Sequence, residues 1–322
     1  MIYVVLAIVL FASMLAYFRI ADKYNIIDKP NQRSSHTQIT IRGGGIVFPI
    51  TALLAGFAFK ASTNDWMLIA GVLAISIVSF WDDVSSLPNK LRVVVHLLAV
   101  TALLYSLNAF VLLPWWVVAI SYVLTIGAIN AYNFMDGING ITGVYSLVLL
   151  LSAWLFYYQN IFDSGLKMSV QIKPLIIACL VFLFFNFRKK AKCFAGDVGS
   201  VSIGYLAIAI VAGIIIQTGE LKYVFFFAVY GVDAVLTIVH RLLLRQNIFE
   251  AHRLHFYQIL ANERKMPHLA VSTLYGIAQL TINVFIVNTE FNWVLTGLLV
   301  CVPLALLYVT VKPKLMNIAL YK

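Results

Sequence analysis

Long apolar stretches separated by short polar connections run through the whole chain. A helix of about 18 apolar residues crosses the ~30 Å hydrocarbon core of a bilayer, so this pattern predicts an all-α, polytopic membrane protein. The second and seventh stretches are short, but tilting or local bilayer thinning would let them span. We count about eleven transmembrane candidates, at residues 1–18, 45–59, 66–81, 93–107, 111–129, 140–158, 174–187, 199–216, 222–240, 269–287 and 293–311.

Composition supports this class. Of the 322 residues, 62% are hydrophobic and only 11% are charged, which is far from the composition of soluble domains. No soluble domain or internal repeat interrupts the pattern, so we expect one integral-membrane domain over residues 1–322. No basic segment precedes the first stretch, which favours an uncleaved membrane helix over a signal peptide. The three cysteines lack metal-ligand spacing and predict no disulfide framework.

The basic residues predict the orientation. With the N-terminus outside, 19 of the 23 Lys and Arg residues fall in inner connections. By the positive-inside rule, the C-terminus and these connections are then cytoplasmic. The net charge of +10 therefore reflects topology first, and no soluble basic domain is present to bind nucleic acid. The four outer basic residues are Lys60, Lys167, Lys173 and Lys222.

Acidic and amide side chains gather where the apolar stretches meet the inner connections. Nine of the 13 acids lie on or near that side, and carboxylates at the ends of membrane helices indicate a functional site. Carboxylates mixed with Lys and Arg suit an anionic substrate bridged by a divalent cation. Mg²⁺ is usually held by one or two carboxylates together with substrate phosphates. A Mg²⁺–phosphate site on the inner side is therefore the expected chemistry.

Asp82 and Asp83 directly follow the third apolar stretch. Acids are disfavoured at the negative end of a helix dipole. Either this is a solvated helix end, or the acids face a cation such as a metal or Lys90. Lys90 is equally compatible with a plain topology charge. The placement of the acids favours the cation interpretation.

A second cluster contains Asn130, Asn133 and Asp136. The spacing of three keeps these polar side chains on one face of a helical turn, and the glycines that follow allow a tight turn. A simple Asn/Gly turn between two membrane helices would explain the glycines but not the polar register. The pattern thus favours oxygen ligands for a hydrated cation, a sugar or a phosphate.

Four further residues, at three places in the chain, have open alternatives. Asp197 opens a helix, where it fits either a helix cap or an anion and metal site. Arg253 and His255 lie in a loop rich in aromatic residues, which suits phosphate and base binding or an amphipathic stretch at the membrane interface. Asp233 lies inside an apolar stretch, where it is expected to bind substrate or to pair with Arg241.

The ordered motifs resemble the polyprenyl-phosphate N-acetylhexosamine-1-phosphate transferases of glycosyltransferase family 4. The motifs are Asp28-Lys-Pro30-x-x-Arg33-x-x-His36, Arg42-Gly-Gly-Gly45, Asp82-Asp83 with Lys90-Leu91, Asn130–Gly140, and Gly196-Asp197-x-Gly-Ser200. The chain is most similar to members that initiate O-antigen, capsule or teichoic-acid glycans. Those carry Asp-Arg-x-His-x-His-His where this chain has His252-Arg253-Leu-His255-Phe-Tyr257-Gln258. A proline that the pattern places before the intramembrane acid is also absent.

The resemblance implies transfer of an N-acetylhexosamine 1-phosphate from a UDP-sugar to undecaprenyl phosphate, with release of UMP. The donor would be UDP-GlcNAc or a 6-deoxy sugar such as FucNAc or QuiNAc. The active site would face the cytoplasm from the inner (plasma) membrane, with Mg²⁺, or Mn²⁺ in its place, as cofactor. The partners would be the bilayer and the two substrates, and a homodimer is compatible with this scheme.

The resemblance also implies residue roles. Mg²⁺ is assigned to Asp197 with Asn133, and Asp82 and Asp83 to the lipid phosphate or its proton. Arg253 and His255 would hold the nucleotide-sugar phosphates. The remaining expected substrate or loop residues are Lys90, Arg33, Arg42, Asn130, Asp136 and Asp233. The competing class is a secondary transporter with an inner acidic ion site, but transporters commonly show internal symmetry and midplane charges.

Overall fold

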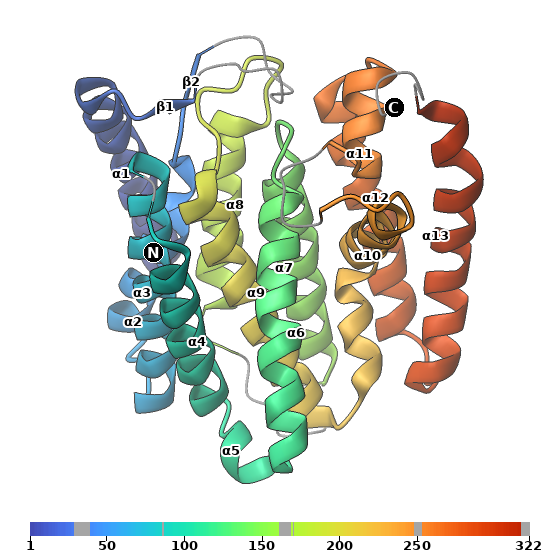
Figure 1. Cartoon of the computed structure of the whole chain (residues 1–322). Coiled ribbons are helices and arrows are strands. Elements are labelled where there is room, and N and C mark those ends of the chain that lie inside the picture. Colours follow the sequence, from blue (N-terminus) through green and yellow to red (C-terminus); the bar gives the residue numbers. More distant parts are fainter. Residues whose placement is uncertain (29–38, 86, 161–168, 170, 248–252, 317–322) are drawn as a thin grey trace.

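In the computed structural model, nearly the whole described chain is helical, and the long helices stand side by side (Figure 1). The structure describes residues 1–28, 39–85, 87–160, 169, 171–247 and 253–316. The α-helices are α1 (Ile2–Tyr24), α2 (Val47–Ala58), α3 (Thr63–Val84), α4 (Asn89–Ser106), α5 (Ala109–Leu112), α6 (Trp115–Phe134), α7 (Ile141–Asn160), α8 (Ile172–Asn186), α9 (Gly196–Thr218), α10 (Ala228–Leu243), α11 (Phe256–Gln258), α12 (His268–Val287) and α13 (Trp293–Leu315). Two 3-10 helices, η1 (Gly44–Ile46) and η2 (Leu221–Phe227), and a π-helical turn, η3 (Ile259–Glu263), complete the helical part.

Each of the eleven predicted stretches coincides largely with a helical segment, which confirms the all-α, polytopic class. In the described part of the chain, eight helical segments are long and apolar enough to cross a membrane. Gly44–Ala58 and α8 are shorter apolar helices, as predicted for the second and seventh stretches. Helix α4 is less apolar because Lys90, Arg92 and His96 lie in its first half. The number of spans and their orientation stay predictions.

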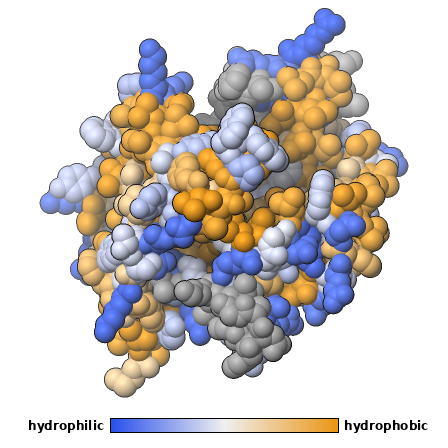
Figure 2. All heavy atoms as spheres, turned by 90° about the horizontal axis from the view of Figure 1, so that it is seen from below, coloured by the Kyte–Doolittle hydropathy of each residue, from blue (hydrophilic) through white to orange (hydrophobic). Residues whose placement is uncertain are grey.

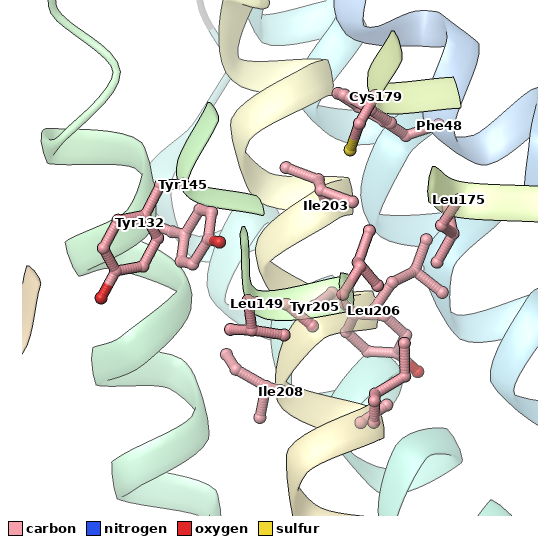
Figure 3. Close-up of a cluster of buried hydrophobic side chains, with 14 of the residues drawn as sticks. Phe48, Tyr132, Tyr145, Leu149, Leu175, Cys179, Ile203, Tyr205, Leu206 and Ile208 are labelled. Atoms are coloured by element: carbon pink, nitrogen blue, oxygen red, sulfur yellow. The ribbon is translucent and has the colours of Figure 1, made fainter. Parts of the chain in front are cut away.

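Helix α9 forms the centre of the molecule. Its sequence is apolar on every side, which is the pattern of a helix surrounded by other helices. In its most apolar 18-residue stretch, 83% is buried inside the protein. Figure 3 shows Ile203 and Leu206 of α9 among side chains of neighbouring helices, including Leu149 and Leu175. Such all-round packing fixes the helix in place. Asp197 is in the first turn of α9, so it lies on the most buried of the eight long apolar helices in the described part of the chain.

The connections that bear the predicted polar clusters lie toward the upper end of the molecule in Figure 1, and α5 lies at the lower end. Figure 2, seen from below, shows hydrophobic residues over much of the circumference, with hydrophilic residues between them. Exposed apolar side chains line the outside of many helices, as a lipid-facing surface requires. The fold thus brings the ends of several helices that carry the predicted polar clusters to one end of the helical bundle.

A small antiparallel hairpin, which the apolar pattern did not predict, follows α1. Strand β1 (Ile27–Asp28) pairs with β2 (Thr40–Ile41) in the register Ile27 to Ile41 and Asp28 to Thr40. The Arg42 backbone N–H donates to the Ile26 carbonyl at 3.2 Å, and the Tyr17 hydroxyl donates to the Arg42 carbonyl at 2.6 Å. These contacts hold Arg42 at the end of the bundle.

A buried polar network joins α7, η2, α10 and α12. Gln279 Oε1 accepts from the Tyr145 hydroxyl at 2.5 Å and from the Val229 backbone N–H at 2.9 Å. Gln279 Nε2 donates to the Phe225 carbonyl at 3.0 Å and to the Asn283 side chain at 2.6 Å. Where η2 passes into α10, some backbone N–H and C=O groups have no partner within the helix. Side chains must supply their hydrogen bonds, because the hydrocarbon core of a bilayer offers no water. Gln279 meets that need.

Replacing Gln279 with Leu should lower the free energy of unfolding by about 1–3 kcal/mol, since buried backbone groups would lose their partners. Thermal unfolding of the purified protein in detergent measures the effect. Thr281→Leu is the control, because Thr281 lies on the same helix, is exposed and bonds only within its own helix. Equal stability of the two variants would show that the network does not stabilise the fold.

Candidate active site

The centre of the candidate site is an arginine between two carboxylates. Arg42 Nη2 lies 2.8 Å from Asp83 Oδ1 and 3.6 Å from Asp197 Oδ1. The Asp83 side chain is 0% exposed and that of Asp197 is 24% exposed. Burial works against the charged form of Arg42, but the carboxylates of Asp83 and Asp197 raise the pKa of Arg42 above its ordinary value. Three residues far apart in the sequence therefore form one charged unit.

Asp83 also anchors the N-terminus of α9. Its Oδ2 accepts from the Val198 backbone N–H at 3.2 Å, one of the N–H groups that a helix start leaves without an intrahelical partner. Gly196 has φ +70°, a backbone conformation that favours glycine. A Cβ there would also lie only 2.7 Å from Asp83 Oδ2, so a larger residue would collide with that carboxylate. The N-cap residue is Ala195, without a side-chain cap bond. Asp197 is thus not the cap, and its carboxylate faces the site.

The end of α6 completes this centre. The Ser200 hydroxyl donates to Asn133 Oδ1 at 2.9 Å, and the Asn133 side chain lies close enough to the Asp197 carboxylate to favour its charged form. Asp136 Oδ1 accepts from the Thr142 hydroxyl at 2.5 Å. Burial raises the pKa of Asp136 to about 7; the Thr142 bond opposes this rise and the Asp197 charge adds to it. Asn130 lies one turn earlier on α6 and is partly buried.

Asp82 occupies a different environment from its neighbour. Its Oδ1 accepts from the Leu87 backbone N–H at 2.9 Å, and its Oδ2 lies 2.8 Å from Arg92 Nη1. The partner cations of the acidic pair are therefore Arg92 and Arg42, whereas Lys90 is exposed in the first turn of α4. The acidic pair divides into a buried Asp83 inside the centre and a more accessible Asp82 at its edge.

The oxygen ligands at this centre fit Mg²⁺. Asp83 Oδ1 is buried and, apart from its ionic contact with Arg42, has no hydrogen-bond donor among the described residues. Asp197 and Asn133 add carboxylate and amide oxygens, and an amide oxygen has two lone pairs. No three His, Cys, Asp or Glu side chains converge on a metal position within the described residues. A donor set this small matches Mg²⁺, which keeps waters and takes further ligands from substrate phosphates.

Asp233 and His255 form a separate buried cluster. Asp233 Oδ1 lies 3.5 Å from His255 Nδ1 and accepts from the Phe256 backbone N–H at 2.9 Å. The Tyr275 hydroxyl donates to Asp233 Oδ2 at 2.7 Å. The protein therefore engages both carboxylate oxygens, and both side chains are only 3–4% exposed. Arg253 is partly buried at the edge of the described part, and the predicted residue Arg33 lies outside the described residues.

Sequence reasoning did not assign Arg92, Ser200 and Thr142, although each contacts a predicted residue. Ser200 belongs to the Gly-Asp-x-Gly-Ser motif and could have been chosen as a helix-start hydroxyl. Thr142 lies six residues after Asp136, in the next helix, so the two residues do not share a helix face and their spacing gave no signal. Arg92 is close to Asp82 because α3 and α4 run back along each other after a short turn. Opposite charges on the two sides of that turn could have indicated this pair.

Comparison with known proteins supports the site. Residues 66–216 match glycosyl transferase family 4, a segment that includes Asp82, Asp83, Asn133 and Asp197. The chain is 25% identical over 295 residues to the probable undecaprenyl-phosphate N-acetylglucosaminyl 1-phosphate transferase of Bacillus subtilis, covering 85% of this chain and 81% of that protein. These similarities confirm the family resemblance of the motifs.

Two further relatives have different names. An undecaprenyl-phosphate alpha-N-acetylglucosaminyl 1-phosphate transferase of Salmonella typhi is 28% identical over 228 residues, covering 63% of this chain and 59% of that protein. A phospho-N-acetylmuramoyl-pentapeptide-transferase of Thermotoga maritima is 25% identical over 256 residues, covering 73% of this chain and 80% of that protein. Two of the three names thus give N-acetylglucosaminyl 1-phosphate as the transferred group, and the third gives phospho-N-acetylmuramoyl-pentapeptide.

Proposed function

We propose that this chain, a member of glycosyl transferase family 4, transfers an N-acetylhexosamine 1-phosphate from a UDP-sugar to undecaprenyl phosphate and releases UMP. The observation that carries the proposal is the convergence of Arg42, Asp83, Asp197 and Asn133 at the N-terminus of the central helix. A helix N-terminus favours phosphate, and the carboxylates beside it favour a cation bound to that phosphate.

The reaction exchanges one phosphoanhydride bond for another. An oxygen of the lipid phosphate attacks the phosphorus that bears the sugar, the bond from that phosphorus to the UMP oxygen breaks, and UMP leaves with the electron pair. A phosphate monoester with a second pKa of ~6 is mostly ionised at neutral pH, so no general base is required. The main need is to neutralise two anions as they approach each other.

The residues divide this task by their positions. Asp197, Asn133 and Asp83 would hold Mg²⁺, which neutralises charge developing on the leaving phosphate. Arg42 lies beside the same oxygens and would contact a phosphate bound at this centre. Asp82 is more accessible than Asp83 and, with Arg92, would contact the lipid phosphate. Asp136, partly buried beside the centre, would contact the sugar.

The finer assignments belong to the same proposal. We favour UDP-GlcNAc as the donor, because several relatives carry N-acetylglucosaminyl in their names; the 6-deoxy sugars FucNAc and QuiNAc are the alternatives. The product would initiate a cell-envelope polysaccharide. The charge distribution supports an inner-membrane location with the site facing the cytoplasm, where nucleotide sugars are made.

Membranes containing the protein should release UMP when given undecaprenyl phosphate, a UDP-N-acetylhexosamine and Mg²⁺. Chelating the divalent cation should reduce the rate to background, and adding Mg²⁺ or Mn²⁺ should restore it, since diphosphate transfer depends on charge neutralisation. A panel of UDP-GlcNAc, UDP-FucNAc and UDP-QuiNAc identifies the sugar. Absence of UMP with every sugar of a broad UDP-N-acetylhexosamine panel would contradict the proposed function.

A further inference from the structure

Tyr257 joins the loop after α10 to the end of α6. Its ring is fully buried, and its hydroxyl donates to the Phe134 carbonyl at 2.9 Å. Phe134 is the last residue of α6, where carbonyls have no intrahelical partner. The Gly137 backbone packs against the same hydroxyl. One oxygen atom thus contacts both sides of the turn at residues 134–137.

This turn carries the residues of the candidate centre. Asn133 is one residue before it, and Asp136 lies within it. A Cβ on Gly137 would lie 2.2 Å from the Tyr257 hydroxyl and 3.0 Å from Cζ, so the ring packs directly against the turn backbone. The position of Tyr257 therefore determines where the end of α6 presents its amide and carboxylate oxygens.

Asp233 holds the backbone of the segment that contains Tyr257. Its Oδ2 accepts from the Phe256 and Tyr257 backbone N–H groups at 3.1 and 3.4 Å and from the Tyr275 hydroxyl. The Thr237 hydroxyl lies 3.2 Å from Asp233 Oδ1 and 2.7 Å from the Tyr308 hydroxyl. Helices α10, α12 and α13 therefore all contribute to holding one short segment, and that segment holds the turn.

We propose that Tyr257 is a positioning residue for the transfer site, which sets the Asn133–Asp136 turn through its hydroxyl, and that Asp233 acts through Tyr257. The inference rests on the proposed function. Tyr257 stands where the family that this chain resembles has a histidine, and the inference gives this tyrosine a structural role. It also assigns Asp233 to holding the loop and not to binding the substrate.

The test is Tyr257→Phe, which removes one oxygen atom and keeps the ring. Tyr205→Phe is a matched control: Tyr205 is also fully buried, and its hydroxyl donates to the Ala99 carbonyl at 2.9 Å. A Cβ on Gly71 would lie 2.1 Å from that hydroxyl, close to the 2.2 Å between a Gly137 Cβ and the Tyr257 hydroxyl. Both variants should lose a similar free energy of unfolding, about 1 kcal/mol.

Only Tyr257→Phe should lose activity. We expect kcat for UMP release to fall at least tenfold, against less than twofold for Tyr205→Phe. Mn²⁺ titration followed by electron paramagnetic resonance gives a readout that does not depend on turnover. The dissociation constant for Mn²⁺ should rise at least threefold in Tyr257→Phe, because the turn that carries Asn133 and Asp136 would lose its contact with the Tyr257 hydroxyl. It should stay unchanged in Tyr205→Phe.

Equal kcat in the two variants would overturn the inference, as would a rate loss matched by a loss of folded protein. If the wild-type protein releases no UMP, the proposed function fails and the Mn²⁺ titration alone decides. Weaker Mn²⁺ binding by Tyr257→Phe than by Tyr205→Phe then supports the positioning role. Indistinguishable binding by the two variants overturns it.

Discussion

Replacing Asp197 with Asn is expected to lower kcat for UMP release by about 10²–10³-fold or more, the size of effect seen when a group that stabilises transition-state charge is lost. Asp197 is the carboxylate of the centre that is not fully buried, at 24% exposure. It lies in the first turn of the most buried helix and interacts with both Arg42 and Asn133. An amide keeps the shape but removes the negative charge that a cation needs.

The fold should survive this change, because Asp197 does not cap its helix and the all-round packing of α9 is unaffected. Asp65→Asn is the matched control: Asp65 is also an acid in the first turn of a helix, but within the described residues its carboxylate bonds only to Ser62. Thermal unfolding and UMP release should be measured for both. Full activity in Asp197→Asn would remove this residue from the proposed metal site.

Replacing Asp83 with Asn should also lower kcat by at least about 10²-fold, and it should cost stability as well. Its carboxylate pairs with Arg42 and accepts from the Val198 N–H, so the variant leaves the Arg42 charge without its nearest partner. Because the Arg42 side chain is 36% exposed, water offsets part of the loss, and we expect about 1 kcal/mol.

Asp82→Asn separates the two roles of the acidic pair. Asp82 is 14% exposed and contacts a turn and Arg92, outside the Arg42 centre. We expect it to reduce kcat strongly while unfolding at nearly the wild-type temperature. The measurement is the change in unfolding temperature of the two variants side by side. A larger destabilisation in Asp82→Asn than in Asp83→Asn would reverse the division of roles.

Much of the architecture could be predicted because membrane helices follow a local rule. An apolar stretch of sufficient length forms a helix whatever its neighbours are, so all eleven stretches correspond to helical segments. The same rule placed Asp82, Asp83, Asn133 and Asp197 at helix ends. The hairpin of β1 and β2 was missed, since two-residue strands leave no periodicity to detect.

Contacts between distant residues could not be predicted in the same way. Nothing in the sequence near Asp83 indicates Arg42, which lies 41 positions earlier, and Lys90 was the nearer candidate for a partner. Asp233 was expected to bind substrate or to pair with Arg241, and in the fold its oxygens accept backbone N–H groups of the 256–257 segment. These pairings depend on how the helices pack, so no local spacing encodes them.

The sequence by itself determined the membrane class, the helical segments and the residue types gathered at their ends, because hydrophobicity and charge act on each segment separately. Tertiary structure alone decided that Asp83 and Asp197 share Arg42, that Asp82 turns away toward Arg92, and that Tyr257 lies beneath the turn of Asp136. Those pairings follow from the packing around α9, because a closely packed buried helix leaves each neighbouring helix few possible positions.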